Sequence, residues 1–163
     1  MIASAKRIPG GEALLKLIKI PGELPWEALE KIYGREVDSR FLRYEFFAQA
    51  GAALYLWEVE GQAVSALRTE PWKDGCLVTA LQTASGCENR GYATMLLRAV
   101  LEDLSQQGSG RVYAHIRHGN VSSIRVHEKC GFRRIADTAR LLDGTVTSRL
   151  GSYKYEIDPP EVI

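Results

Sequence analysis

A patterned helix between two strand-like segments places the strongest constraint on the fold of this chain. From Ala93 to Gln106 the apolar side chains recur at helical spacing, and the sequence QQGSG follows. Residues 76–84 before the helix and 111–118 after it have the apolar patterns of strands. Two strands that are joined by a single crossover helix lie parallel in one sheet. We therefore expect one parallel strand pair here.

The other segments predict a sheet that is otherwise mostly antiparallel. They comprise strands at 12–20, 52–61 and 62–70, helices at 25–36, 39–51 and 120–131, and two C-terminal strands around a glycine-containing turn. The order indicates an α+β fold with a mixed, mostly antiparallel sheet of about six or seven strands flanked by four helices. No repeat or linker is apparent, so we expect a single domain over residues 1–163.

Composition narrows the classes of function. The net charge of +1 argues against a general role in binding nucleic acid or membranes. Cys76, Cys87 and Cys130 include no CxxC pair, which fits a reducing compartment and argues against a disulfide framework or a zinc ribbon. No apolar run resembles a signal peptide or a membrane span. We expect a cytoplasmic protein without a metal, either monomeric or homodimeric.

Charge is distributed unevenly along the chain. From Arg111 to Arg149 there are eight Arg or Lys residues and three acidic residues. This region could hold an anionic ligand, or it could be an ordinary solvated basic face.

The loop that leads into the 93–106 helix offers backbone rather than catalytic side chains. Gly91 and Ala93 are small, which allows a tight turn, and the first N–H groups of a helix have no partner within it. Such a terminus can bind phosphate through amides and the helix dipole. The loop matches neither a P-loop nor the dinucleotide fingerprint with its three glycines. By itself it could also be a structural turn.

The helix at 120–131 carries a second group of polar residues. Asn120 caps its start, and His127 lies seven residues later on the same face. We expect both side chains to point toward the crevice beside the loop. The alternative for His127 is a core position in which a backbone carbonyl satisfies the ring.

Together the two segments resemble the acetyl-CoA-binding core of the GNAT family of N-acetyltransferases. The family pattern is Arg or Gln, two residues, Gly, one residue, then Gly or Ala, and Glu88 to Ala93 match it except at the first position. The second pattern is matched by Asn120, Ser123, Ile124, Val126, Glu128, Lys129, Gly131 and Phe132. The resemblance covers residues 76 to 134.

The resemblance implies acetyl-CoA as cofactor. Its pyrophosphate would lie on the loop amides, and its pantetheine arm would pair with the backbone of the preceding strand. A β-bulge in that strand would aim an amide at the thioester carbonyl. The cofactor-binding residues implied are Leu81, Gln82, Thr83, Glu88, Asn89, Arg90, Gly91, Tyr92, Ala93, Thr94 and Asn120.

The resemblance also suggests catalytic residues and shows departures. His127 occupies the position of a tyrosine that protonates the departing thiolate, and an imidazole can serve as general acid. Gln82 stands where several relatives carry Glu; a neutral amide cannot accept the proton but could orient a water. Glu88 replaces the basic or amide residue at the head of the loop.

Other ionisable residues leave the general base open. Glu70 and Asp74 could act as bases or be solvated turn residues, and His115 and His118 could be bases or packing residues. Cys130 is interpreted as a packing residue, because no base is paired with it by spacing.

The implied activity is direct acetyl transfer from acetyl-CoA to a primary amine in a ternary complex. The acceptor could be a small molecule, an amino acid or a peptide terminus, enclosed by residues 25–51 and 142–151. The alternative is a non-catalytic acyl-CoA-binding or regulatory domain.

Overall fold

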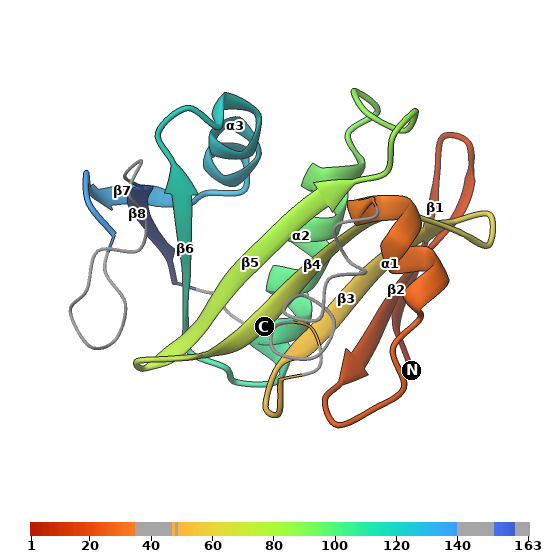
Figure 1. The fold of residues 1–163 in the computed structure, drawn as a ribbon, viewed down its shortest axis with the longest axis horizontal. Helices are drawn as coiled ribbons and strands as arrows, with labels where there is room; N and C mark the ends of the chain where they lie inside the picture. The colour runs from red at the N-terminus through yellow and green to blue at the C-terminus, as the bar shows by residue number, and fades with distance from the viewer. Residues whose placement is uncertain (35–46, 48, 140–151, 159–163) are drawn as a thin grey trace.

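One mixed sheet organises the computed structural model, which describes residues 1–34, 47, 49–139 and 152–158. Within these residues eight strands run in the order β1-β2-β3-β4-β5-β6-β8-β7, with three helices on the sheet (Figure 1). The strands are β1 (Ile2–Ile8), β2 (Gly11–Lys19), β3 (Ala53–Val59), β4 (Gln62–Trp72), β5 (Gly75–Thr83), β6 (Arg111–Arg117), β7 (Arg133–Ala136) and β8 (Ser152–Ile157). The helices are α1 (Trp26–Tyr33), α2 (Tyr92–Gln106) and α3 (Val121–Lys129).

The predicted parallel pair is confirmed. β5 and β6, which α2 connects, pair in parallel, and the other neighbouring strands pair antiparallel. The parallel register covers only Gly75 to Val78 against Arg111 to Ala114. Gly75 allows this close approach, because a Cβ there would lie 1.7 Å from the carbonyl oxygen of Arg111.

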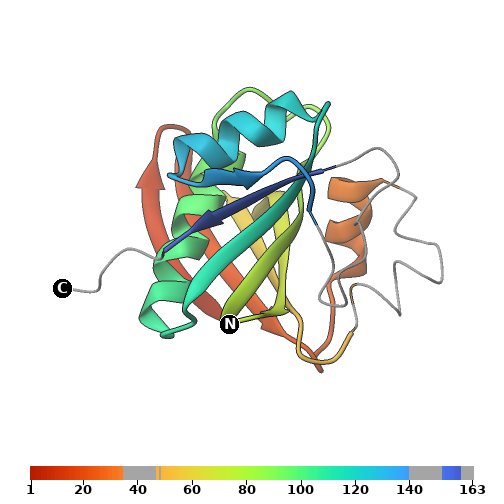
Figure 2. The same ribbon diagram turned by 90° about the vertical axis from the view of Figure 1, so that its left-hand side faces the viewer.

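Helices cover both faces of the sheet. Figure 2 shows α1 on one face and α2 and α3 on the other. The apolar stripe of α2 is fully buried and consists of Leu96, Leu97, Val100, Leu101 and Leu104. Leu29 and Ile32 of α1 pack on the opposite face. Each such side chain contributes about 1.5–3 kcal/mol through removal of apolar surface from water.

The predicted count of six or seven strands was wrong, because β1 was missed. Only Ile8 of β1 is buried, and the strand lies at the sheet edge beside β2. An edge strand that is exposed on both faces has no apolar alternation to reveal it. The predicted C-terminal strand pair is confirmed by β7 and β8.

The predicted count of four helices also differs from the three helices of the described residues. The predicted helix at 39–51 lies mostly outside those residues. The strand expected at 62–70 is longer in the structure, where β4 continues through Pro71 and Trp72. The turn is therefore confined to Lys73 and Asp74.

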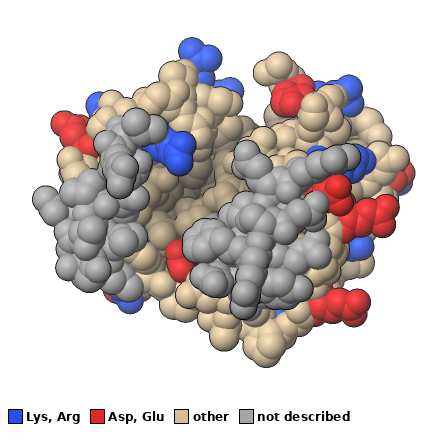
Figure 3. All heavy atoms as spheres, viewed as in Figure 1, with Lys and Arg blue, Asp and Glu red and all other residues tan. Residues whose placement is uncertain are grey.

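Surface charge is mixed. On the face in Figure 3, basic and acidic side chains are scattered, and neither sign forms a continuous patch. None of the helices in the described ranges is long and apolar enough to cross a membrane.

Candidate functional site

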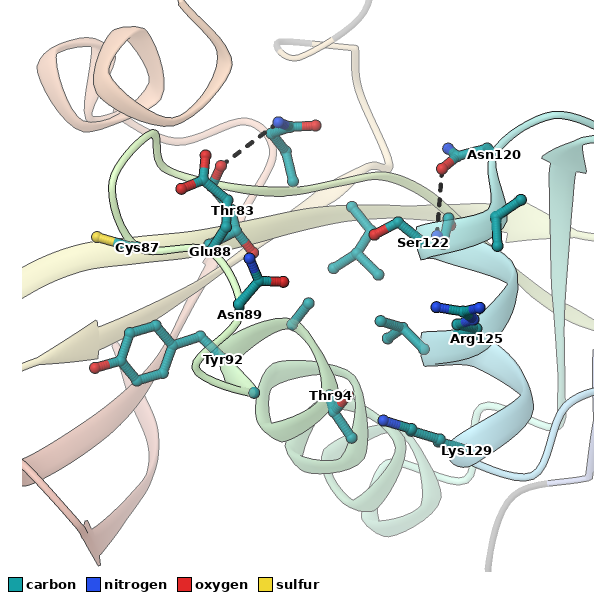
Figure 4. A pocket seen from close by; sticks show the side chains of 17 residues that line it. Thr83, Cys87, Glu88, Asn89, Tyr92, Thr94, Asn120, Ser122, Arg125 and Lys129 are labelled. Carbon is teal, nitrogen blue, oxygen red and sulfur yellow. Dashed lines mark hydrogen bonds between the residues drawn. The ribbon is translucent and has the colours of Figure 1, made fainter.

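A cavity of about 540 Å³ lies between the end of β5, the loop after it, the first turn of α2 and one face of α3 (Figure 4). Its walls therefore come from both segments that the sequence pointed to. The lining residues are Leu81, Gln82, Thr83, Cys87, Glu88, Asn89, Gly91, Tyr92, Ala93, Thr94, Asn120, Val121, Ser122, Ser123, Arg125, Val126 and Lys129.

The β5 wall is a strand edge that has no neighbouring strand on its β6 side within the described residues. Pairing with β6 ends at Val78, so the backbone beyond it has no β6 partner, and Leu81, Gln82 and Thr83 line the cavity. Such an edge can accept an extended ligand as an additional strand.

A β-bulge interrupts this edge, as predicted. The register with β4 shifts between the pairs Arg68 with Thr79 and Ala66 with Gln82, and Ala80 adopts a positive φ of 56°. The hydroxyl of Tyr33 in α1 donates a 2.6 Å hydrogen bond to the carbonyl oxygen of Ala80. The bulge is thus held from the opposite face of the sheet and re-aims the following amides.

The first turn of α2 presents unpaired amides to the cavity. Gly91 caps the helix in the left-handed conformation, with φ 79°, and makes no side-chain capping bond. The first backbone bond to Gly91 comes from the amide of Met95. The amides of Tyr92, Ala93 and Thr94 therefore precede the helical ladder, and no acidic residue lies in this turn. This terminus suits an anion, particularly a phosphate.

The start of α3 forms the facing wall. The side chain of Asn120 accepts a 3.2 Å hydrogen bond from the amide of Ser123, which confirms the predicted cap. Asn120 itself lines the cavity. The two helices thus bring both their N-terminal turns to one site.

Comparison with known proteins agrees with this geometry. The model of the acetyltransferase (GNAT) family matches residues 21–132, more than half of the chain. The chain belongs to this family. No curated protein sequence matches it.

Solved GNAT structures share the fold. A GNAT family acetyltransferase from Elizabethkingia anophelis with acetyl-CoA bound has a TM-score of 0.67 and 13% identity, with 90% of this chain and 97% of that chain covered. The ribosomal-protein-S18-alanine N-acetyltransferase from Escherichia coli has a TM-score of 0.65 and 11% identity, with 91% of this chain and 96% of that chain covered. A Bacillus subtilis acetyltransferase in complex with CoA has a TM-score of 0.63 and 10% identity, with 88% of this chain and 97% of that chain covered. At these identities the likeness concerns the fold.

The structure gathers most residues that the GNAT resemblance implied for cofactor binding. All of them line the cavity except Arg90. Glu88 lines it but is engaged within its own loop, where its carboxylate accepts a 2.8 Å hydrogen bond from the amide of Gly86. Gln82 is exposed at the β5 edge, where its side-chain amide lies 3.5 Å from the carbonyl oxygen of Thr83.

His127 lies elsewhere. The expectation that it shares a cavity-facing side of α3 with Asn120 was wrong: His127 is 3% exposed and does not line the cavity. Its Nδ1 is 2.7 Å from the carbonyl oxygen of Ser123, and its ring packs edge-on against Phe132. The cavity-lining side chains of α3, which extend to Lys129, lie on another face of the helix, so the ring of His127 is turned into the core. Burial lowers the pKa of the imidazole, which the bond to Ser123 partly opposes.

Three polar residues on the α3 wall were not assigned to the site from the sequence: Ser122, Arg125 and Lys129, of which only Lys129 had been noted as a match to the GNAT pattern. They are three or four residues apart and so share one face of the helix. This spacing, within the basic C-terminal region, was the signal that could have identified them.

The alternative bases lie outside the cavity lining. Glu70 is in strand β4 rather than in a turn, and its carboxylate lies 3.5 Å from the guanidinium of the buried Arg68. Asp74 is exposed and accepts a hydrogen bond from the hydroxyl of Tyr113, which lowers the pKa of its carboxyl group. Both carboxylates have protein partners.

The other histidines and Cys130 also have local surroundings. Burial, with a smaller effect of nearby lysines, lowers the pKa of His115 to about 4, and its ring packs edge-on against Trp72. His118 Nε2 lies 2.7 Å from the carbonyl oxygen of Asp137. Burial raises the pKa of the Cys130 thiol, as expected for a packing residue. Within the described residues no three His, Cys, Asp or Glu side chains lie together as metal ligands.

Proposed function

We propose that this GNAT protein transfers an acetyl group from acetyl-CoA directly to a primary amine in a ternary complex. One observation carries the proposal: the unpaired edge of β5 and the unpaired amides of α2 face the same cavity. A strand edge suits an amide-containing pantetheine arm, and a helix terminus suits a pyrophosphate. The E. anophelis and B. subtilis neighbours were solved with acetyl-CoA and CoA.

The described residues fit this cofactor. The amides of Tyr92, Ala93 and Thr94 would hold phosphate oxygens, Leu81 to Thr83 would pair with the pantetheine arm, and Asn120 would contact it from α3. Acetyl-CoA supplies the acetyl group as an activated thioester. The amides re-aimed by the bulge would polarise the acyl carbonyl and stabilise the developing oxyanion.

His127 remains the predicted proton donor to the thiolate, and the structure sets a condition for that role. Nδ1 faces a carbonyl oxygen, which only accepts, so the neutral ring carries its proton on Nδ1 and a lone pair on Nε2. Donation from Nε2 therefore requires the doubly protonated ring, which burial disfavours. The acid also requires a path from the buried ring to the cavity.

The acceptor class stays open among a small molecule, an amino acid and a peptide terminus. The E. coli neighbour is named for a protein alanine acceptor, which favours including peptide termini among the candidates. Of the expected acceptor walls at 25–51 and 142–151, residues 35–46, 48 and 142–151 lie outside the described residues. Gln82 would orient a water that accepts the amine proton.

A non-catalytic acyl-CoA-binding domain is the second candidate. Glu88 is the only acidic residue among those lining the cavity, and its carboxylate is bonded to Gly86. Since Gln82 is neutral, the described cavity contains no free carboxylate base.

Two measurements test the proposal. Acetyl-CoA at about 100 times its dissociation constant should add about 2.7 kcal/mol to the free energy of unfolding and so raise the melting temperature. A panel of amines, amino acids and peptides should then release free thiol from acetyl-CoA. Absence of a thermal shift at millimolar ligand would contradict the cofactor assignment. Binding without turnover on any acceptor would favour the non-catalytic domain.

A further inference from the structure

The charges around the cavity are few and unevenly placed. Among the described residues that line it, Arg125 and Lys129 are the only cations, and Glu88 is the only anion. Both cations belong to α3, where Lys129 matches the second GNAT pattern, whereas the basic or amide residue that the first pattern has at the head of the loop before α2 is absent.

The loop itself offers no cationic side chain to the cavity. At its head stands Glu88, whose carboxylate turns back to the amide of Gly86. Arg90, the basic residue of the loop, does not line the cavity. A phosphate at the α2 terminus would therefore receive backbone amides from this side and positive charge only from the opposite wall.

The α3 wall is built to supply that charge. Arg125 and Lys129 are four residues apart, so they lie on one helical face, and Figure 4 shows them on the side of α3 toward α2. Neither forms an ion pair within the described ranges. The neighbouring Glu128 accepts a 3.0 Å hydrogen bond from the hydroxyl of Tyr155, away from the cavity lining.

We propose that Arg125 and Lys129 bind the phosphate groups of coenzyme A and replace the cation that the loop head lacks. This inference rests on the proposed function. The cofactor carries phosphate in two places, the pyrophosphate and the 3′-phosphate of its adenosine. Charged donors bond either one strongly, and Arg can do so with two N–H groups.

The test compares ligands that differ by one phosphate. Calorimetric titration measures the affinity of the wild type and of the double variant Arg125→Gln/Lys129→Gln for CoA and for dephospho-CoA, which lacks the 3′-phosphate. The matched control is Lys6→Gln/Arg7→Gln, which removes two exposed charges from β1 at the opposite edge of the sheet. We expect the double variant to bind CoA about tenfold or more weakly, as expected for lost hydrogen bonds to a charged group. The control should stay within about twofold, because its charges lie beyond the screening length.

Each outcome bears on the proposal. A loss confined to CoA assigns the two residues to the 3′-phosphate, and an equal loss for both ligands assigns them to the pyrophosphate. Unchanged affinity of the double variant, with wild type and control binding normally, overturns the proposal and leaves the proposed function intact. A wild type that binds neither ligand overturns both. Melting without ligand checks the fold; should the double variant melt early, the two single variants carry the same comparison.

Discussion

The helices α2 and α3 begin at the same cavity but satisfy their first turns differently. α2 starts at a glycine, with no side-chain bond to its first amides. α3 starts at Asn120, whose side chain accepts from the amide of Ser123, and the carbonyl of Ser123 is bonded by His127. The start of α2 thus leaves backbone N–H groups for a ligand, whereas α3 uses the N–H group of Ser123 in a bond to its own cap. Under the proposed function, the α2 terminus, whose first amides have no side-chain partner, would bind the anion, and α3 would supply side chains.

A large loss of cofactor binding is expected when a side chain closes the incomplete terminus of α2. Gly91→Glu places a carboxylate beside the amides of Tyr92 to Thr94 and should weaken acetyl-CoA binding by about 100-fold or more, the worth of one or two charge-assisted hydrogen bonds. Calorimetric titration measures the effect. The control is Gly91→Ala, which shares the left-handed strain of about 1–2 kcal/mol but adds no charge. Equal affinities in the two variants would show that the α2 terminus does not bind phosphate.

The next prediction concerns turnover and the ring of His127 in α3. His127→Phe keeps a flat ring against Phe132 but removes the proton. If His127 is the general acid, turnover should fall by about 10²–10⁴-fold while the affinity for acetyl-CoA changes little. A Tyr replacement should recover part of the loss. Steady-state rates with the best acceptor give the measurement. Wild-type turnover in the Phe variant, with chemistry rate-limiting, would make His127 a packing residue.

A smaller effect is expected at the α3 cap. Asn120→Ala removes the bond to Ser123 and should cost about 1 kcal/mol of stability, or about 2–4 °C in melting temperature without ligand. Asn120→Asp retains an acceptor and should melt close to the wild type. If the Ala variant melts like the wild type, the α3 terminus is as independent of its cap as α2, and the contrast between the helices disappears.

The smallest change is expected on mild acidification. Burial lowers the folded-state pKa of His127 and takes that of His115 to about 4, so the unfolded chain binds protons first as the pH falls. The two neutral histidines therefore make their whole contribution to the free energy of unfolding above the ordinary histidine pKa of about 6.5, and this contribution decreases as the pH falls below it. Melting temperatures at about pH 7.5 and about pH 6.5 should differ accordingly, and His127→Phe should reduce the difference. A larger difference in that variant would contradict a lowered pKa of His127 in the folded protein.

Local patterns predicted the parts of the fold that depend on local physics. The apolar spacing of α2 and the cap of α3 predicted both helices, and the crossover rule predicted the parallel pair. The strand β1 could not be recognised, because its pairing with β2 depends on backbone bonds and its side chains are mostly exposed.

In the candidate site, too, features that depend on local sequence were predicted, and features that depend on the packing of distant segments were not. Its backbone elements, the bulge and the α2 terminus, were predicted from small residues and a family pattern. Arg125 and Lys129 were not assigned to the cavity, because charge on a helix does not reveal which element it faces. For His127, helical periodicity gave the face of α3 but not what that face meets in the fold. The cavity runs along another face, which carries Ser122, Arg125 and Lys129, so the ring is buried in the core instead.

The early divergence of β5 from β6 has a consequence for the motions of the protein. The β6-facing amides between Thr79 and Thr83 lie in the middle of an eight-stranded sheet, yet no strand in the described part of the chain pairs with them on that side. Amides of this kind exchange with solvent deuterons by small local openings, whereas those of flanking β4 require opening of the sheet. A fast-exchanging segment inside a slowly exchanging sheet is therefore expected. An extended ligand at this edge would slow exchange there, so deuterium uptake by this short segment would report occupancy of the cavity residue by residue.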